Sequence, residues 1–332
     1  MSRPTASARE LVRRTLAGDR AALARAISLV ENEAPEAAPL LDACFTHSGR
    51  ARRIGVTGPP GAGKSTLVTR IGRLYRDHGE TVAVVAVDPT SPFSGGALLG
   101  DRVRMAELAG DRGVFIRSMA TRGGLGGLAV HTAQVCDVLD AAGFSRILIE
   151  TVGVGQSELE VAQTADTTAV VLVPESGDAV QAMKAGLMEI GDLFVINKAD
   201  REGAERGAYA VRSALEMRPR GGWDPPVLLT VASQGTGVEA VVGALEAHLA
   251  HLEQRGALEQ RRRLRLEQRL EDLVRARLWG DFRDRVPRDR WREVVAELVE
   301  RRLTPRQAAA RVVGQETAVR AASGGVASEP RR

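Results

Sequence analysis

Cysteine is scarce in this chain of 332 residues, and a long apolar segment is missing. Its two cysteines, Cys44 and Cys136, belong to no C-x-x-C or Cys/His pattern. We therefore expect neither a disulfide framework nor a structural zinc site, and the sequence favours a reducing cytoplasm. No run approaches the roughly 18 apolar residues of a membrane span, and the N-terminus carries Glu10 and Asp19 rather than a hydrophobic signal core. Membrane insertion and secretion are not expected.

A strong surplus of charge of one sign is also missing. The chain has 46 basic and 42 acidic side chains, which give a formal net charge of +4. This balance does not indicate a dedicated nucleic-acid surface. With 332 residues and 44% hydrophobic content, the chain is long enough for two small domains or for one large α/β domain with helical additions. We prefer the second organisation.

A glycine-rich stretch near residue 60 has a phosphate-binding pattern. Residues 58–65 read Gly-Pro-Pro-Gly-Ala-Gly-Lys-Ser, which fits G-x-x-x-x-G-K-[ST]. A β-branched run precedes the pattern and an amphipathic helical pattern follows it, so backbone N–H groups can cradle the phosphates of a nucleoside triphosphate. An incidental Gly/Pro turn would not require this context. The predicted nucleotide-binding residues of the loop are Gly58, Pro59, Pro60, Gly61, Ala62, Gly63, Lys64, Ser65 and Thr66.

Strand-like runs recur through the middle of the chain and are separated mainly by helical patterns. After the run that precedes Gly58, they lie at about 81–87, 113–117, 145–150, 168–173, 192–196 and 226–231. Unbroken β-branched runs suit parallel strands that are covered on both faces. The alternation predicts an α/β fold of the P-loop NTPase type, a doubly wound and mainly parallel sheet with N-terminal and C-terminal helical extensions. Functional residues should follow the carboxyl ends of the strands.

Helical patterns flank the predicted sheet on both sides. We expect an N-terminal helical segment over residues 1–48 with Asp19 as a helix N-cap, and a nucleotide-binding domain over 49–250. The predicted helices over 251–320 contain more leucines than the faces of the sheet can cover. We therefore prefer a dimerisation arm to a lid on the domain. Thr304 and Pro305 should open a helix that ends near Gly314. Residues 321–332 should be disordered.

A second motif indicates the base of the nucleotide. Asn197-Lys198-Ala199-Asp200 follows a predicted strand, where the Asp200 carboxylate can accept hydrogen bonds from N1–H and the exocyclic amine of guanine. Adenine lacks this pair of donors and would leave the acid unsatisfied, so GTP and GDP are favoured over ATP and ADP. An ordinary helix-capping turn is the alternative. In Thr230-Val231-Ala232-Ser233 we expect the Ala232 N–H to meet the guanine oxygen, although Val231 replaces the serine usual in GTPases.

Oxygen-bearing side chains that suit Mg²⁺ also follow the predicted strands. Ser65 is the expected direct ligand, because its hydroxyl follows the phosphate-binding lysine. Asp88, Asp101 and Glu150 are expected as direct or water-mediated partners, since Mg²⁺ prefers oxygen ligands and keeps several waters. For Asp101 a solvent-exposed salt bridge with a neighbouring arginine is the alternative.

Residues 150–153 resemble the γ-phosphate sensor loop of GTPases, with the Gly153 N–H facing the phosphate. The next residue is Val154, where Ras-type proteins carry the glutamine that orients the attacking water. An apolar side chain cannot orient water. We therefore expect slow hydrolysis unless Gln156, a switch residue or a partner protein supplies the orientation, as in a regulated switch.

Together these motifs resemble those of one family, the MeaB/ArgK/MMAA-type P-loop GTPases, which are chaperones of adenosylcobalamin-dependent acyl-CoA mutases. The resemblance also rests on residues 88–96, which read Asp-Pro-Thr-Ser-Pro-Phe-Ser-Gly-Gly, on Gly18 to Ala26, and on Gly155-Gln156-Ser157. Gly177-Asp178 with Gln181 and Lys184 completes it. The resemblance covers most of the chain.

The resemblance implies a GTPase that docks on methylmalonyl-CoA mutase or a relative, gates loading of the cobalamin cofactor, and protects or reactivates the mutase. It further implies a Mg²⁺ and hydrolysis role for the three carboxylates, an additional switch containing Lys184, and a homodimer formed through C-terminal helices. The expected catalytic residues are Lys64, Asp88, Asp101, Glu150, Gly153, Gln156 and Lys184.

Three other classes stay open. A nickel-insertion or other metal-insertion GTPase is disfavoured, because the chain has no His-rich tract or paired cysteines to carry metal. An ATP-dependent kinase or transport ATPase would bind ADP more tightly than GDP. A non-catalytic binding module would fit Val154 but would hydrolyse no GTP.

Overall fold

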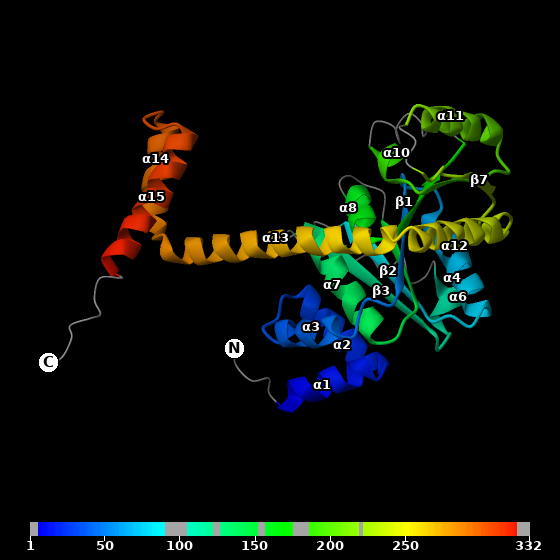
Figure 1. The fold of residues 1–332 in the computed structure, drawn as a ribbon, viewed down its shortest axis with the longest axis horizontal. Coiled ribbons are helices and arrows are strands. Elements are labelled where there is room, and N and C mark those ends of the chain that lie inside the picture. Colours follow the sequence, from blue (N-terminus) through cyan, green and yellow to red (C-terminus); the bar gives the residue numbers. More distant parts are fainter. Residues whose placement is uncertain are drawn as a thin grey trace. The chain divides into compact units, whose positions relative to one another are not determined.

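A parallel sheet of seven strands forms the centre of the computed structural model, which describes residues 6–89, 105–121, 127–151, 157–174, 186–218 and 222–323 (Figure 1). The strand order is β3-β2-β4-β1-β5-β6-β7, and every pair is parallel. The strands are β1 (Arg52–Thr57), β2 (Val82–Pro89), β3 (Val114–Thr121), β4 (Arg146–Thr151), β5 (Thr167–Leu172), β6 (Leu193–Asn197) and β7 (Val227–Thr230). The predicted doubly wound α/β fold is confirmed, and β3 ends at Thr121 rather than at 117.

Helices cover both faces of this sheet, which explains why β5 and β6 are buried along their whole length. One face packs on α4 (Lys64–Asp77), α6 (Ala106–Ala109) and α12 (Val238–Gln254). The other face packs on α7 (Gly127–Ala141), α8 (Ser157–Thr164), α10 (Leu187–Ile190) and α11 (Ala204–Glu216). Because both faces of the sheet are covered, apolar side chains point to both sides of the strands, and polar residues do not alternate with apolar ones along them.

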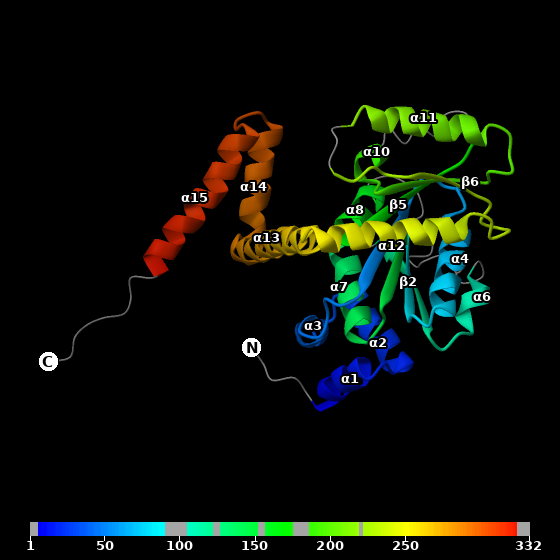
Figure 2. The same ribbon diagram turned by 45° about the vertical axis from the view of Figure 1, so that its right-hand side comes forward.

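Three helices precede the sheet: α1 (Ala6–Leu16), α2 (Arg20–Glu31) and α3 (Ala37–Phe45). Asp19 caps α2 as predicted, since its Oδ1 accepts a 2.9 Å hydrogen bond from the Ala22 N–H. Leu23, Ile27 and Leu40 are fully buried in the same core as α7. The helices α2 and α3 lie beside α7 (Figure 2). The N-terminal helices therefore extend the core on the α7 side of the sheet.

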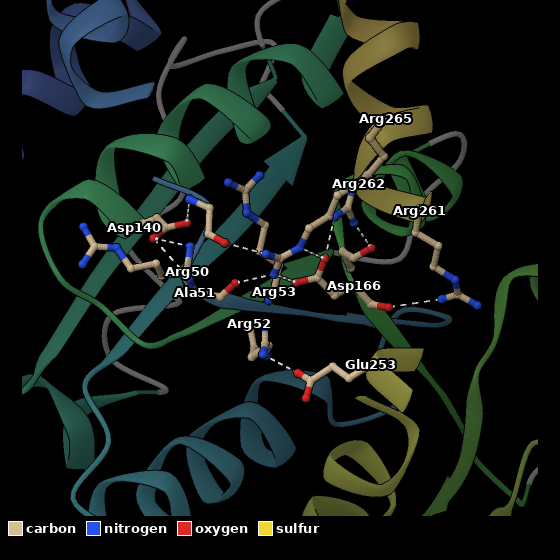
Figure 3. Close-up of polar contacts among 12 residues, drawn as sticks. Arg50, Ala51, Arg52, Arg53, Asp140, Asp166, Glu253, Arg261, Arg262 and Arg265 are labelled. Carbon is tan, nitrogen blue, oxygen red and sulfur yellow. Dashed lines mark hydrogen bonds and ion pairs between the residues drawn. The ribbon is translucent and has the colours of Figure 1, made fainter. Parts of the chain in front are cut away.

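The first turns of α13 (Ala257–Arg285) attach to the amino-terminal edge of the sheet through arginines (Figure 3). Arg262 Nη2 lies 2.8 Å and Arg265 Nη2 lies 2.5 Å from the two carboxylate oxygens of the fully buried Asp166. Arg261 pairs with Asp192 at 3.0 Å. Burial raises the pKa of the Asp166 carboxyl, but the two arginines outweigh this effect and hold the pKa at about 2. This cluster lies before β5 and therefore at the edge opposite the phosphate-binding loop.

The chain forms two compact units, residues 1–267 and 268–332. The second contains the rest of α13 with α14 (Arg288–Val299) and α15 (Pro305–Ser323). The helix expected to end near Gly314 continues to Ser323, because a single glycine costs only about 1 kcal/mol within a sequence of good helix formers. Residues 324–332 of the predicted tail lie outside the described residues, and the predicted domain boundaries stay predictions. Within the described chain, no helix has the length and apolar character to cross a bilayer.

Candidate nucleotide-binding site

The phosphate-binding loop connects β1 to α4, and its glycines are required by two close approaches. Gly58 has φ 138°, and a Cβ there would lie 2.0 Å from the Val171 carbonyl oxygen. Gly63 has φ 87°, and a Cβ there would lie 2.3 Å from Asn197 Nδ2. Both conformations and both distances exclude other residues. The loop is thus packed directly against β5 and β6.

Lys64 opens α4 and bends back over this loop. Its side chain is 5% exposed, and Nζ donates to the carbonyl oxygens of Gly58 at 2.7 Å and Pro59 at 2.8 Å. A buried ammonium group needs such acceptors. Phosphate oxygens can replace these carbonyls, so the geometry suits the phosphate-binding role predicted for Lys64.

Ser65 and Glu150 bring two oxygen-bearing side chains together beside Lys64. The Ser65 hydroxyl donates a 2.5 Å hydrogen bond to Glu150 Oε1, and both side chains are buried. Thr57 directly precedes the loop, and Thr151 directly follows Glu150. Their hydroxyl groups share a buried 3.0 Å hydrogen bond. A hydroxyl and a carboxylate are ligands that fit Mg²⁺. Among the described residues no group of three or more His, Cys, Asp and Glu side chains is arranged for a metal ion.

Several predicted site residues are not placed by the structure. Asp88 pairs with Ala120 at the end of β2, as expected, but its side chain is outside the described part of the chain. The others are outside it altogether: Asp101, Gly153, Gln156 and Lys184.

Asn197 joins the phosphate-binding loop to the turn after β7. Its Nδ2 donates to the Ala62 carbonyl oxygen at 2.8 Å, and its Oδ1 accepts from Thr230 Oγ1 at 3.1 Å and from the Ala232 N–H at 3.0 Å. Lys198, at φ 58°, donates from Nζ to the Gly61 carbonyl oxygen at 2.7 Å. The two residues predicted to bind the nucleotide therefore also brace the loop, a role the motif alone did not indicate.

Two observations concern the side of the site where the base is predicted to bind. Asp200 follows this brace and is exposed, so its carboxylate is accessible to a ligand. The Ala232 N–H, which we expected to meet guanine, is instead used by Asn197. The supporting Thr230 hydroxyl was not predicted, because its partner is distant in sequence.

A glycine-rich loop between the first strand and its helix, a lysine over the loop and a following Asn-Lys-x-Asp brace define a P-loop GTPase. The model of one family, described as methylmalonyl Co-A mutase-associated GTPase MeaB, matches residues 23–286. The chain belongs to this family, and its resemblance to the MeaB/ArgK/MMAA-type GTPases is confirmed.

Similar proteins agree over most of the chain. A protein of Pyrococcus abyssi that is named as a GTPase is 45% identical over 304 residues, which cover 90% of this chain and 94% of the relative. The GTPase ArgK of Escherichia coli is 41% identical over 76% of this chain and 78% of the relative. A crystal structure described as LAO/AO transport system kinase matches with a TM-score of 0.73 and 30% identity, covering 96% of this chain and all of that one.

Proposed function

We propose that this GTPase docks on an adenosylcobalamin-dependent acyl-CoA mutase of the methylmalonyl-CoA mutase type. There it gates loading of the cobalamin cofactor and protects or reactivates the mutase. The observation that carries the proposal is the family match over residues 23–286, because the family is described by its association with this mutase. The Asp-Pro-Thr-Ser-Pro stretch from Asp88, which is not a generic GTPase feature, supports it.

The nucleotide would lie with its phosphates on residues 58–66 and its guanine at Asp200. The contact of Ser65 with Glu150 supports a Mg²⁺ site there, with Asp88 and Asp101 as further partners. When bound, Mg²⁺ neutralises charge on the phosphate oxygens. Lys64 would hold the β/γ-phosphates, and the Gly153 N–H would face the γ-phosphate.

Hydrolysis would depend on the partner protein. Val154 replaces a water-orienting glutamine, so the isolated protein should turn over slowly. Gln156 or a group of the mutase would orient the water, and the loop containing Lys184 would relay docking. The protein would act in the cytoplasm.

We also propose a homodimer formed through the C-terminal helices. Among the side chains of residues 268–314, which the structure describes in the unit of residues 268–332, three apolar ones are buried: Val294, Ala308 and Val312. Large apolar side chains of α13 are exposed in the same unit, namely Leu270, Leu273, Val274, Leu278 and Trp279. Such a surface is typical of an interface between proteins.

We expect a mass of twice 35.4 kDa in solution. The double variant L270E/L278E should have the mass of the monomer, whereas the control Y209E on α11 should keep the mass of the dimer.

The central experiment measures GTP hydrolysis by the full chain with and without a cobalamin-dependent methylmalonyl-CoA mutase. We expect slow turnover that rises about tenfold or more when the mutase is added, because a partner group that orients water or stabilises charge accelerates GTP hydrolysis. Lys64→Ala should abolish turnover in both cases. An unrelated acyl-CoA enzyme should give no stimulation. If no acyl-CoA mutase stimulates hydrolysis, the mutase partnership is wrong while the GTPase assignment stands.

A further inference from the structure

Arg70, one turn and a half into α4, contacts the turn that follows β7. Its Nη2 donates to the Ser233 carbonyl oxygen at 3.1 Å and its Nε to the Ala232 carbonyl oxygen at 3.4 Å. The third nitrogen, Nη1, lies 3.4 Å from Glu107 Oε2 on α6. One guanidinium group therefore links α4, α6 and the turn on the base side of the site. No predicted motif contains Arg70.

The turn itself has a nearly complete set of backbone hydrogen bonds. The Gln234 N–H donates to the Val231 carbonyl at 2.9 Å, and the Gly235 N–H donates to the Ala232 carbonyl at 3.2 Å. The Val231 N–H donates to the Thr236 carbonyl oxygen at 3.0 Å. The Ala232 N–H is used by Asn197. Within the described chain, the Ser233 N–H is the one amide between 231 and 235 that has no acceptor.

We propose that Arg70 is a positioning residue for guanine recognition, which it serves by fixing the turn of residues 231–235 on α4. This inference rests on the guanine pocket proposed above. The Ser233 N–H, rather than that of Ala232, is then the backbone donor for the 6-oxo group of guanine. The hydrogen bonds from the Gln234 and Gly235 N–H groups close two overlapping turns. In such turns successive N–H groups point in about the same direction, so the Ser233 N–H should point the same way as the Ala232 N–H, which contacts Asn197.

The position of Arg70 couples the base side to the phosphate side. The same helix begins at Lys64, and six residues at about 1.5 Å each separate the two side chains by roughly 9 Å along α4. The turn is thus held at a fixed distance from the phosphate-binding loop. Arginine suits this role because its planar fork can satisfy two carbonyl groups at once, whereas lysine presents a single charged nitrogen.

The test compares binding of GDP with binding of inorganic pyrophosphate, which uses the loop but has no base. In Arg70→Gln we expect GDP affinity to fall about tenfold, which corresponds to about 1.4 kcal/mol, while pyrophosphate affinity stays within about twofold. Arg70→Lys should lie between this variant and the wild type. Arg73→Gln, on the same helix and paired with Asp77 in an exposed contact at 3.3 Å, is the matched control and should bind both ligands normally.

Two results would overturn the proposal: unchanged GDP affinity in Arg70→Gln, or an equal loss for GDP and pyrophosphate, which would show general loosening of the domain. A second measurement uses the wild type and needs no variant to fold. Residue-resolved amide exchange should show protection of the Ser233 N–H by GDP, but not by 2-aminopurine riboside diphosphate, which lacks the 6-oxo group. Protection that is equal with both ligands also refutes the donor assignment. A wild type that binds ADP as tightly as GDP would instead refute the guanine pocket itself.

Discussion

The Ser65 hydroxyl donates to Glu150 Oε1 over 2.5 Å, so the helix that follows the phosphate-binding loop is joined to the end of β4 by one short hydrogen bond. Both side chains are buried, and a negative charge in such a place needs a positive partner or strong donors. This contact makes the charge of Glu150 the property to test.

Glu150→Gln preserves the shape of the side chain and removes its charge. We expect Mg²⁺-dependent GTP hydrolysis to fall by about tenfold or more, because the amide is a poor partner for a hydrated cation. Hydrolysis measured across a Mg²⁺ titration checks this. Glu246→Gln, whose carboxylate contacts Tyr75 away from the loop, is the control. A variant with normal turnover and a normal Mg²⁺ requirement would exclude Glu150 from the metal site.

Asn197→Ala should loosen the phosphate-binding loop. The substitution leaves the Ala62 carbonyl, the Thr230 hydroxyl and the Ala232 N–H without this partner, and each buried group left unsatisfied costs about 1–3 kcal/mol. We expect the free energy of unfolding to fall by about 3 kcal/mol and GDP binding to weaken with it. Chemical unfolding and calorimetry measure the two effects. Asn32→Ala, at an exposed helix end, should change stability by only about 0.5 kcal/mol.

Asp200→Asn should change the preferred base. The amide offers donors where the carboxylate offered acceptors, so xanthine nucleotides should gain and guanine nucleotides should lose at least about a hundredfold in affinity. Asp200 is exposed, so the melting temperature should not move. Competition between GDP and XDP measures the preference. Glu202→Gln, two residues further on, is the control, and unchanged selectivity in Asp200→Asn would place the base pocket elsewhere.

Acid should destabilise the protein through His248. This side chain is fully buried, with Nδ1 2.8 Å from Thr167 Oγ1. Burial lowers its pKa from 6.5 to about 4, although Asp192 opposes the shift. Because the folded pKa lies below the unfolded one, neutral His248 stabilises the fold fully above about pH 6.5, and this stability is lost as the pH falls toward about 4.

The loss approaches about 3 kcal/mol, since each pKa unit corresponds to about 1.4 kcal/mol. Unfolding by urea at pH 7 and at pH 4.5 measures it, and His248→Gln should show a clearly smaller difference between the two conditions. The Asp166 carboxylate, with a pKa of about 2, titrates below this window and does not mask the effect. An equal difference in both proteins would assign the acid sensitivity to other groups.

Local sequence was sufficient for the sheet, the phosphate-binding loop and the Asp19 cap, because each depends on residues within one or two turns of chain. The end of α15 was missed for a local reason, since Gly314 was given more weight than the helix formers that follow it. The contacts that organise the site were missed for another reason. Asn197 with Thr230, and Arg70 with Ser233, join residues far apart in sequence, and no spacing predicts such pairs.

The lysines that contact the phosphate-binding loop make the site chemically distinct from the rest of the molecule. The chain has only three lysines, Lys64, Lys184 and Lys198, while its other basic side chains are arginines. Lys64 and Lys198 both donate to loop carbonyls, and the third lies outside the described residues. Amine-directed acylation of this protein is therefore limited to the α-amino group and these three lysines, two of which contact the phosphate-binding loop, and it leaves the arginines unlabelled. The extent of labelling at Lys198 becomes a direct gauge of how far the loop is occupied.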